Sequence, residues 1–449
     1  MAKKNVTVIG AGLVGSLLSI FLARRGYKVE IYERRGDMRK ETVEAGRSIN
    51  LALSDRGIKA LEAVGIAGEV LKIAIPMHGR FIHNLDGSHA FQPYGKKGQY
   101  INSVSRGELN AKLMDLAEEN GVNIHFGHKC DTVNFKENSI VFDGGSGRVV
   151  KSFDLIFGSD GAYSAARLSH MLQHNKFDYQ QYYIDCGYKE LSIPAGENGS
   201  FLLEKNALHI WPRKQYMLIA LPNLDGSFTG TLFFPFEGEQ SFEKLVTEKD
   251  VTEFFSQTFP DVVKLIPDLN FQYFRNPTSS LVTIKCFPWV RKDHYCLIGD
   301  AAHGIVPFFG QGMNAGFEDC SVLDELMNQH GEDWGTILGE FQDRRKPDAD
   351  AIADLAITNF TEMRARTADP TFLLQKKIEA LLHERYPDQW IPAYTQVTFR
   401  TDIRYSEALE NTIRQEAIMQ EVMQQPNIGS NWDSEELSSQ IIQKLMHHK

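Results

Sequence analysis

The chain opens with a short apolar run, a glycine-rich turn and a longer apolar stretch. Residues 5–9 are β-like, the turn covers 10–15, and the apolar stretch that continues to residue 23 is long enough for a helix. A second β-like run follows at 27–33. This order predicts a strand, a helix and a second strand, which is the unit that builds parallel sheets.

A different pattern fills residues 176–284, which are rich in Phe and Tyr. The β-like runs in this region cover 207–212, 216–222 and 228–235. Turn-forming residues at 212–214 and 224–227 separate these runs, so we expect an antiparallel sheet with one buried face. A segment at 77–95 also has the character of a hairpin.

Beyond residue 345 the apolar positions recur three and four residues apart, for example at 374–383 and 406–410. This spacing predicts amphipathic helices. One interpretation is that these helices cap a pocket or pack against a partner chain. An equal alternative is that they form a packing domain with no further role. The pattern gives no oligomeric state.

Composition excludes several classes of function. The formal net charge of −10 disfavours a general nucleic-acid binder, which needs a basic face. No apolar run reaches the length of a bilayer span and no secretory leader precedes the first strand, so we expect no membrane span. The 5 cysteines lack CxxC spacing, which predicts reduced thiols, a cytoplasmic location and no metal site.

The turn after the first strand has the GxGxxG spacing of dinucleotide-binding folds. Gly10 permits the tight turn, Gly12 lets the backbone approach a pyrophosphate, and Gly15 lets helix and strand pack closely. Glu33 ends the next strand, where a carboxylate can accept hydrogen bonds from an adenosine ribose. Because strand, helix and acid all accompany the glycines, we prefer a Rossmann-like fold to a chance glycine cluster, with the pyrophosphate at the helix N-terminus.

Two later segments resemble the fingerprints of the group A flavoprotein monooxygenases. In the first, a buried-type strand at 153–158 leads into Asp-Gly-x-x-Ser-x-x-Arg, and the second contains Gly-Asp-Ala at 299–301. The resemblance implies that the bound dinucleotide is FAD. It also implies NADPH as a co-substrate that docks in a groove and leaves, since no second GxGxxG unit is present.

These segments also supply candidate flavin contacts. Asp300, at a strand end, can accept hydrogen bonds from the ribityl hydroxyls, and Arg106 can hold the flavin or its phosphates. The helix that starts at Gly312 would stabilise the anionic reduced flavin through its N-terminus. The alternatives are a helix N-cap for Asp300 and a surface charge for Arg106. His303 follows Asp300 closely, but such a histidine is more often structural, so we assign it no catalytic role. The remaining expected FAD contacts are Arg34, Ala52, Met313 and Asn314.

A more specific resemblance extends over essentially the whole chain. The segments similar to the kynurenine 3-monooxygenase family are 46–54, 77–80, 92–95, 209–213 and 307–314. This family implies hydroxylation of L-kynurenine to 3-hydroxy-L-kynurenine with NADPH and O2 through a C4a-hydroperoxyflavin. An arylamine is already electron-rich and needs no strong base, so we name no catalytic residue. Membrane-anchored relatives carry an apolar tail, and the polar residues 441–449 predict a soluble form here.

The same resemblance implies that Arg80 and Tyr94 bind the amino-acid carboxylate. A guanidinium forms paired hydrogen bonds with a carboxylate, and the alternative is an arginine in solvent at a strand edge. The other expected substrate contacts are Met217, Ile219, Leu221, Phe233, Pro307, Phe309, Asn359, Met363 and Tyr394. For the apolar residues of the sheet, simple core packing is the alternative.

The expected architecture is α/β, with a Rossmann-like, three-layer FAD-binding fold around a parallel sheet, an antiparallel β-sheet substrate domain and a C-terminal helical region. The expected domains are a discontinuous FAD-binding domain at 1–75, 101–175 and 285–344, a substrate domain at 76–100 and 176–284, and a helical domain at 345–449. Two other functions stay open: a flavin oxidoreductase of this fold that does not hydroxylate, and a non-catalytic nucleotide-dependent binding module.

Overall fold

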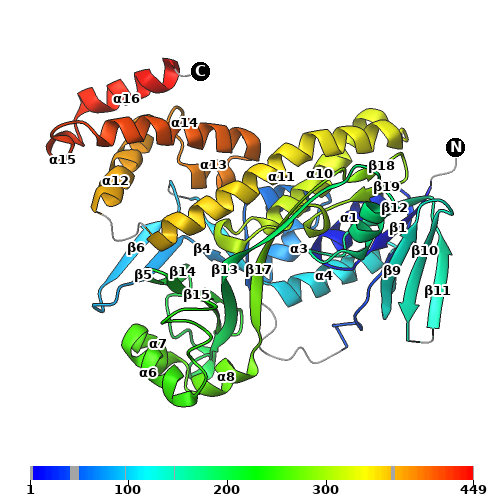
Figure 1. Ribbon diagram of the computed structural model, residues 1–449, viewed down its shortest axis with the longest axis horizontal. Coiled ribbons are helices and arrows are strands. Elements are labelled where there is room, and N and C mark those ends of the chain that lie inside the picture. Colours follow the sequence, from blue (N-terminus) through cyan, green and yellow to red (C-terminus); the bar gives the residue numbers. More distant parts are fainter. Residues whose placement is uncertain (1–3, 41–49, 97, 146, 366–369, 448–449) are drawn as a thin grey trace.

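Two large sheets organise the protein, and long helices run across both of them (Figure 1). The computed structural model describes residues 4–40, 50–96, 98–145, 147–365 and 370–447, and for 361–365 the backbone alone. Within these ranges, no helix is long and apolar enough to cross a bilayer.

The first sheet has six strands in the order β18-β19-β12-β1-β2-β8. These strands are β1 (Asn5–Ile9), β2 (Lys28–Tyr32), β8 (Asn123–His125), β12 (Leu155–Gly158), β18 (Val290–Arg291) and β19 (Tyr295–Leu297). All neighbours pair in parallel except β18 and β19 at one edge. The predicted strand–helix–strand unit and its parallel sheet are therefore confirmed.

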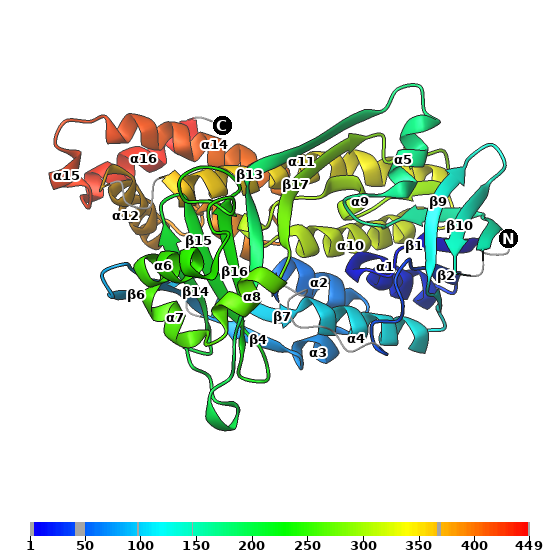
Figure 2. The same cartoon turned by 60° about the horizontal axis from the view of Figure 1, so that its bottom comes forward.

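Helices cover one face of this sheet, and a small antiparallel sheet covers the other (Figure 2). The helices are α1 (Leu13–Arg24), α4 (Arg106–Glu119) and α10 (Gly312–His330). The small sheet consists of β9 (His128–Asn134), β10 (Ser139–Gly144) and β11 (Gly147–Ser152), with α5 (Ala165–Leu172) packed beside β9. The rings of Tyr32 and Phe142 stack between the two sheets with centroids 4.2 Å apart. The expected three layers are present.

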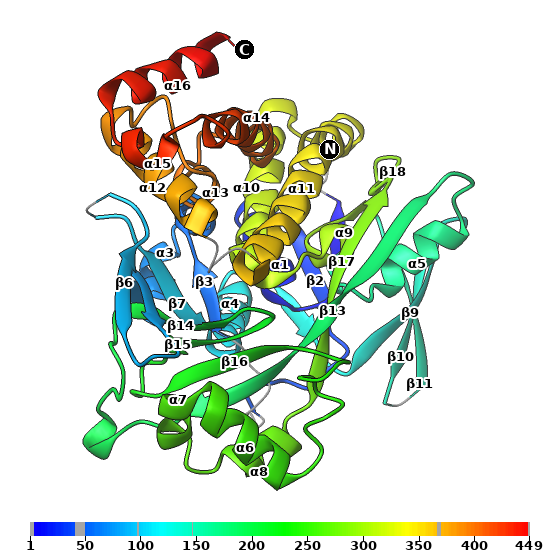
Figure 3. The same cartoon turned by 60° about the vertical axis from the view of Figure 1, so that its left-hand side comes forward.

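The second sheet has seven strands in the order β17-β13-β16-β15-β14-β5-β6 (Figure 3). They are β5 (Gly79–His83), β6 (His89–Pro93), β13 (Asp178–Ile193), β14 (Ala207–Arg213), β15 (Tyr216–Pro222), β16 (Phe228–Pro235) and β17 (Thr278–Phe287). Neighbours pair antiparallel, as expected, except β14 and β5, which pair in parallel. The hairpin predicted at 77–95 joins this sheet as β5 and β6.

Alternate residues of the seven-stranded sheet face opposite sides, as strand geometry requires. Leu218 and Leu232 belong to a buried cluster with Phe255 of α6, on the outer face. The helices of that face are α6 (Glu248–Thr258), α7 (Pro260–Leu265) and α8 (Leu269–Arg275). Met217 and Phe233 point the other way and pack with residues of the C-terminal half. The inner face is therefore available to roof a site.

A third sheet and two helices lie between the two large sheets in the fold. The sheet has the order β3-β7-β4, with β3 (Asn50–Leu53), β4 (Ala74–Met77) and β7 (Ile101–Ser105). The helices are α2 (Asp55–Ala63) and α3 (Ala67–Leu71). Helix α2 packs closely on α10, which ties β3 to the nucleotide layer.

The C-terminal region is helical, as its apolar spacing predicts. Its helices are α11 (Trp334–Ala365), α12 (Pro370–Arg385), α13 (Ala393–Phe399), α14 (Tyr405–Met423), α15 (Ile428–Asn431) and α16 (Glu435–His447). Helix α11 begins before residue 345, so the expected domain boundary falls inside a continuous helix. The division of the chain into three domains stays a prediction.

Candidate active site

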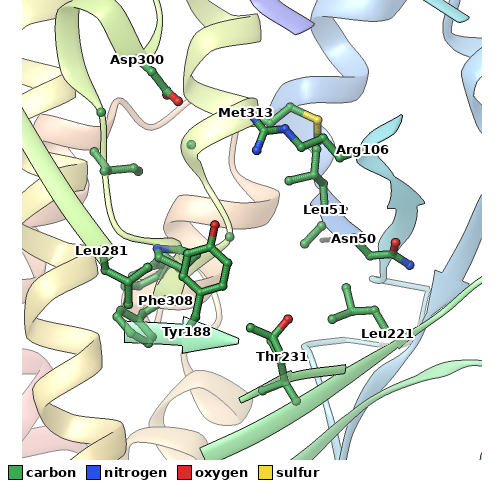
Figure 4. A pocket seen from close by; sticks show the side chains of 18 of the residues that line it. Asn50, Leu51, Arg106, Tyr188, Leu221, Thr231, Leu281, Asp300, Phe308 and Met313 are labelled. Atoms are coloured by element: carbon green, nitrogen blue, oxygen red, sulfur yellow. The ribbon is translucent and has the colours of Figure 1, made fainter. Parts of the chain in front are cut away.

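A cavity of about 390 Å³ opens between the parallel sheet and the inner face of the seven-stranded sheet (Figure 4). Its wall combines the β1–α1 turn, β3, the segment after β19, the start of α10 and the roof formed by β13 to β16. Two short elements complete this wall, α9 (Asp300–His303) and the 3-10 turn η2 (Pro307–Phe309). Segments far apart in sequence therefore meet at one site.

The glycine turn between β1 and α1 is built for a close approach. A Cβ on Gly15 would lie 2.1 Å from the carbonyl oxygen of Gly10, so the strand and helix can pack this tightly only with glycine. Gly10 has φ +99, a conformation that glycine adopts without strain. Gly12 faces the cavity, and a Cβ there would meet no described atom within 4 Å. The open space at the start of α1 fits a pyrophosphate.

Glu33 is buried behind this turn and is not part of the cavity wall. Its Oε2 accepts a hydrogen bond from the Ala11 N–H at 2.9 Å, and its Oε1 accepts one from Nε of Arg35 at 2.7 Å. Burial opposes ionisation, but the bonds from Arg35 and Ala11 hold the pKa of Glu33 below its usual value. Glu33 thus fastens the glycine turn, and its contact with a ribose stays a prediction. Arg34 is exposed at the end of β2.

Asp300 projects into the cavity as the first residue of α9 (Figure 4). The N-cap position of this helix is Gly299, so the N-cap alternative for Asp300 is wrong. Its carboxylate accepts no hydrogen bond from the described part of the chain, and it is exposed toward the cavity. Gly312, the first residue of α10, also lines the cavity. A free carboxylate and a helix N-terminus therefore share one wall.

Arg106 and Met313 line the same cavity from α4 and α10 (Figure 4). Ala52 lines it from β3. Arg106 is exposed and lines this space, so its contact with a flavin stays a prediction beside the surface-charge alternative. Asn314 differs, because it is fully buried and outside the wall. Its Nδ2 donates to the carbonyl oxygens of Ala52 and Gly310, both at 2.8 Å. Asn314 therefore fixes β3 against the start of α10.

Arg80, Tyr94 and Tyr394 form a polar group in another part of the wall. The Arg80 guanidinium carbon lies 4.5 Å from the ring centroid of Tyr394 and 5.3 Å from that of Tyr94. The two tyrosine rings are stacked, with centroids 5.4 Å apart. Burial raises the pKa of both phenols, which keeps them protonated donors at neutral pH.

Two donors of this group lack an anionic partner in the part of the chain that the structure describes. The Tyr94 hydroxyl is buried there without a hydrogen bond, and the Arg80 guanidinium forms no salt bridge with a described residue. A buried donor without a partner is costly. An anion at this point would satisfy both groups, so the arrangement suits a carboxylate. The alternative of an arginine in bulk solvent does not fit this position.

The rest of the wall is apolar. The expected residues Met217, Ile219, Leu221, Phe233, Pro307 and Phe309 all line the cavity. Further lining residues that the sequence interpretation missed are Tyr188, Leu208, Ile210, Thr231, Leu281 and Phe308. The two-residue alternation along β14 and β16 carried a signal for Leu208, Ile210 and Thr231, because they share a face with residues that were identified. Phe308 was passed over although it stands between Pro307 and Phe309.

Among the expected substrate contacts, one is absent from the wall and one has no described side chain. The Nδ2 of Asn359 donates to the carbonyl oxygen of Phe308 at 2.7 Å, and Asn359 is not part of the cavity wall. Its substrate contact stays a prediction. The side chain of Met363 and residues 46–49 lie outside the described residues.

The polar side chains of the Asp-Gly-x-x-Ser-x-x-Arg segment form hydrogen bonds within the protein. Asp160 accepts a bond from the Ala165 N–H at 2.7 Å and another from the Ser164 hydroxyl. Nη1 of Arg167 donates to the carbonyl oxygen of Ala301 at 2.8 Å. The motif therefore braces the turn that carries Asp300.

His303 belongs to a buried ion network. Its Nε2 lies 2.6 Å from Oδ2 of Asp319, whose Oδ1 accepts from Nε of Arg345 at 2.7 Å. Asp319 and Arg345 are fully buried. His303 therefore has a structural contact, and the absence of a catalytic role stays a prediction.

Comparisons with known proteins agree with this geometry. A protein-family model described as an FAD binding domain matches residues 3–356. A kynurenine 3-monooxygenase of Flavobacterium psychrophilum is 51% identical over 448 residues, which cover 99% of each chain. One of Sus scrofa is 48% identical over 415 residues, covering 91% of this chain and 86% of the relative.

Solved structures share the fold at lower identity. A tetrameric form of 2-methyl-3-hydroxypyridine-5-carboxylic acid oxygenase superposes with a TM-score of 0.68 at 19% identity, covering 82% of this chain and 95% of that one. Klebsiella pneumoniae HpxO complexed with FAD and uric acid gives a TM-score of 0.68 at 19% identity, over 83% of this chain and 92% of that one.

Proposed function

This chain belongs to the kynurenine 3-monooxygenase family of FAD-binding proteins, and on that premise we propose that it hydroxylates L-kynurenine to 3-hydroxy-L-kynurenine with NADPH and O2. Bound FAD supplies the redox chemistry, because it accepts a hydride and activates oxygen. The protein supplies binding, orientation and a cavity that excludes water.

The observation that carries the proposal is that one cavity is lined both by donors that suit an anion and by groups that suit a flavin. Arg80, Tyr94 and Tyr394 offer donors for an amino-acid carboxylate, while Asp300 and the start of α10 offer contacts for the cofactor. A mostly apolar wall joins the two. Kynurenine has this order of groups, with a carboxylate at one end and an arylamine at the other.

The residues present fit FAD. The open start of α1 at Gly12 would receive the pyrophosphate, and Asp300 would accept from the ribityl hydroxyls. The N-terminus of α10 at Gly312 would lie against the ring, where its positive end stabilises the negative charge of the reduced form. Arg106 and Met313 would complete the contact from two further elements.

The substrate residues act by position. Arg80 and Tyr94 would fix the carboxylate, and the ring pair of Phe233 and Phe308, with centroids 5.1 Å apart, would hold the aromatic ring. The apolar wall keeps water away from the reacting carbon and the activated oxygen. No strong base is required, because the amine already activates the ortho carbon.

The test is mass spectrometry of the product formed from kynurenine, NADPH and ¹⁸O₂. The proposal expects a product heavier by one ¹⁸O atom, formed in proportion to the NADPH that is oxidised when kynurenine is present. A flavin oxidoreductase that does not hydroxylate would oxidise NADPH without adding oxygen to kynurenine. A non-catalytic binding module would leave NADPH unchanged, so either result would overturn the proposal.

We also propose that the reaction takes place in the cytoplasm. Cys130, Cys286, Cys296 and Cys320 are buried and form no disulfide bond within the described residues. Burial raises the pKa of the Cys296 and Cys320 thiols, so they stay protonated and unreactive. A reducing compartment suits such a chain.

A further inference from the structure

A buried hydrogen bond connects the C-terminal helices to the start of α10 at Gly312, which is the proposed binding surface for the flavin ring, here called the flavin seat. The Tyr405 hydroxyl, at the first residue of α14, donates to Oε1 of Gln311 at 2.8 Å. Gln311 is the N-cap residue of α10 and directly precedes Gly312, which lines the cavity. Both side chains are almost fully buried, at 0% and 1% exposure.

The turn that contains Gln311 has little other support on this side. Gly310 adopts φ +66, and within the described residues the other side-chain hydrogen bond of Gln311, from Nε2 to the Phe309 carbonyl oxygen, is long at 3.5 Å. Asn314 pins the opposite side of the turn through Ala52 and Gly310. Tyr405 therefore provides the well-formed bond that holds Gln311 from the C-terminal side.

Tyr405 is itself held rigidly. The Arg56 guanidinium carbon lies 4.1 Å from the centroid of its ring. Arg56 also donates to the carbonyl oxygen of Val397 at 2.7 Å and to Oε1 of Glu318 at 2.7 Å. Because the ring of Tyr405 is buried against an arginine that is itself bonded to α10 and α13, the position of its hydroxyl is well fixed relative to Gln311.

We propose that Tyr405 is a positioning residue for the cofactor: through Gln311 it fixes the first turn of α10 so that the N–H groups there face the flavin ring. The first N–H groups of a helix have no intrahelical partner and carry the positive end of its dipole. Their orientation matters most for the anionic reduced flavin. The inference rests on the proposed function only in taking the start of α10 as the flavin seat.

The test compares Tyr405→Phe, Gln311→Met and the double variant. Each change removes one side of the same bond, so the proposal expects all three to weaken binding of oxidised FAD to the apoprotein by a similar factor, about three- to tenfold, because loss of a buried bond partner is costly. The effects should not add in the double variant. Reduced FAD should lose more affinity than oxidised FAD, and a tenfold larger loss would lower the midpoint potential by about 30 mV.

Tyr386→Phe is the matched control, because Tyr386 also bonds through its hydroxyl, to Ser439 at 3.3 Å, within the C-terminal helices and far from α10 in the fold. It should leave FAD affinity and potential as in the wild type. If Tyr405→Phe lowers the melting temperature but leaves both quantities unchanged, the inference is wrong. If Tyr405→Phe does not fold, Gln311→Met decides, and wild-type values in that variant overturn it.

These outcomes separate this inference from the proposed function. A wild-type protein that binds FAD but does not hydroxylate kynurenine contradicts the proposed function alone. A wild-type hydroxylase whose Tyr405→Phe variant keeps its FAD affinity and potential contradicts only the positioning role.

Discussion

The guanidinium of Arg80 lies over the ring of Tyr394, 4.5 Å from its centroid, although the two residues come from a strand near the N-terminus and a helix near the C-terminus. The contact closes the anion site with a residue from the C-terminal helices. If the proposed function is correct, those helices take part in substrate binding as well as in packing.

Replacing Arg80 with Met should remove the carboxylate partner and leave the flavin seat intact. We expect kynurenine affinity to fall by about a hundredfold to several thousandfold, equivalent to about 3–5 kcal/mol for losing one side of a buried ion pair. Titration of kynurenine against flavin absorbance measures this loss. The FAD content should match that of the wild type, and an unchanged Michaelis constant would contradict the assignment.

Tyr94→Phe should affect stability and binding differently. The hydroxyl is buried without a partner in the described residues, so its removal should not lower the melting temperature of the ligand-free protein. Kynurenine should bind about 10- to 150-fold more weakly, because a bond to a charged carboxylate contributes about 1.5–3 kcal/mol. Thermal unfolding with and without kynurenine checks both parts. A less stable free protein with normal affinity would assign Tyr94 to packing.

Asp300→Asn should weaken FAD binding about tenfold, the lower end for losing a charged hydrogen bond. The stability of the apoprotein should change little, because the carboxylate has no partner in the described chain. Fluorescence quenching on reconstitution with FAD gives the affinity. An equal affinity for FAD would remove Asp300 from the site.

Gly12→Ala and Gly15→Ala form a matched pair. At Gly15 a Cβ would lie 2.1 Å from a backbone oxygen, so the variant should lose about 1–3 kcal/mol of stability even without cofactor. At Gly12 the space is open, so the apoprotein should fold normally but bind FAD weakly. Denaturant unfolding of both apoproteins distinguishes the two roles, and equal losses of stability would contradict them.

Glu33 should contribute to stability in a pH-dependent way. Its pKa is lower in the folded protein than in the unfolded chain, where it is about 4.3. The contribution is therefore complete above the unfolded pKa and is lost as the pH falls through the folded value. The difference in unfolding free energy between wild type and Glu33→Gln should be constant above about pH 5 and shrink below about pH 4. A difference that does not vary down to pH 3 would contradict this.

The sequence predicted the elements whose signals are local. The glycine turn, the alternating strands and the amphipathic helices all depend on residues a few positions apart, and they occur where expected. The parallel pairing of β5 with β14 was not predictable, because nothing in either segment indicates its partner across the intervening chain.

In the site, too, features with a local sequence signal were predicted and features that depend on distant contacts were not. Motif residues such as Gly12, Asp300 and Arg80 carry their chemistry in their local pattern, and they line the cavity. Asn314 belongs to a segment that the sequence identified as part of the site, but its side-chain amide donates hydrogen bonds to the carbonyl oxygens of Ala52 and Gly310. Which polar atoms stay free depends on tertiary contacts, and these also create the bond between Tyr405 and Gln311.

We propose that one cavity holds the flavin and, through Arg80, the carboxylate of kynurenine. The decisive experiment titrates kynurenine and its decarboxylated analogue against the flavin absorbance of the wild type and of Arg80→Met. We expect the wild type to prefer kynurenine by about a hundredfold or more, and the variant, still carrying FAD, to have lost this preference. A variant that keeps the full preference would show that the carboxylate binds elsewhere.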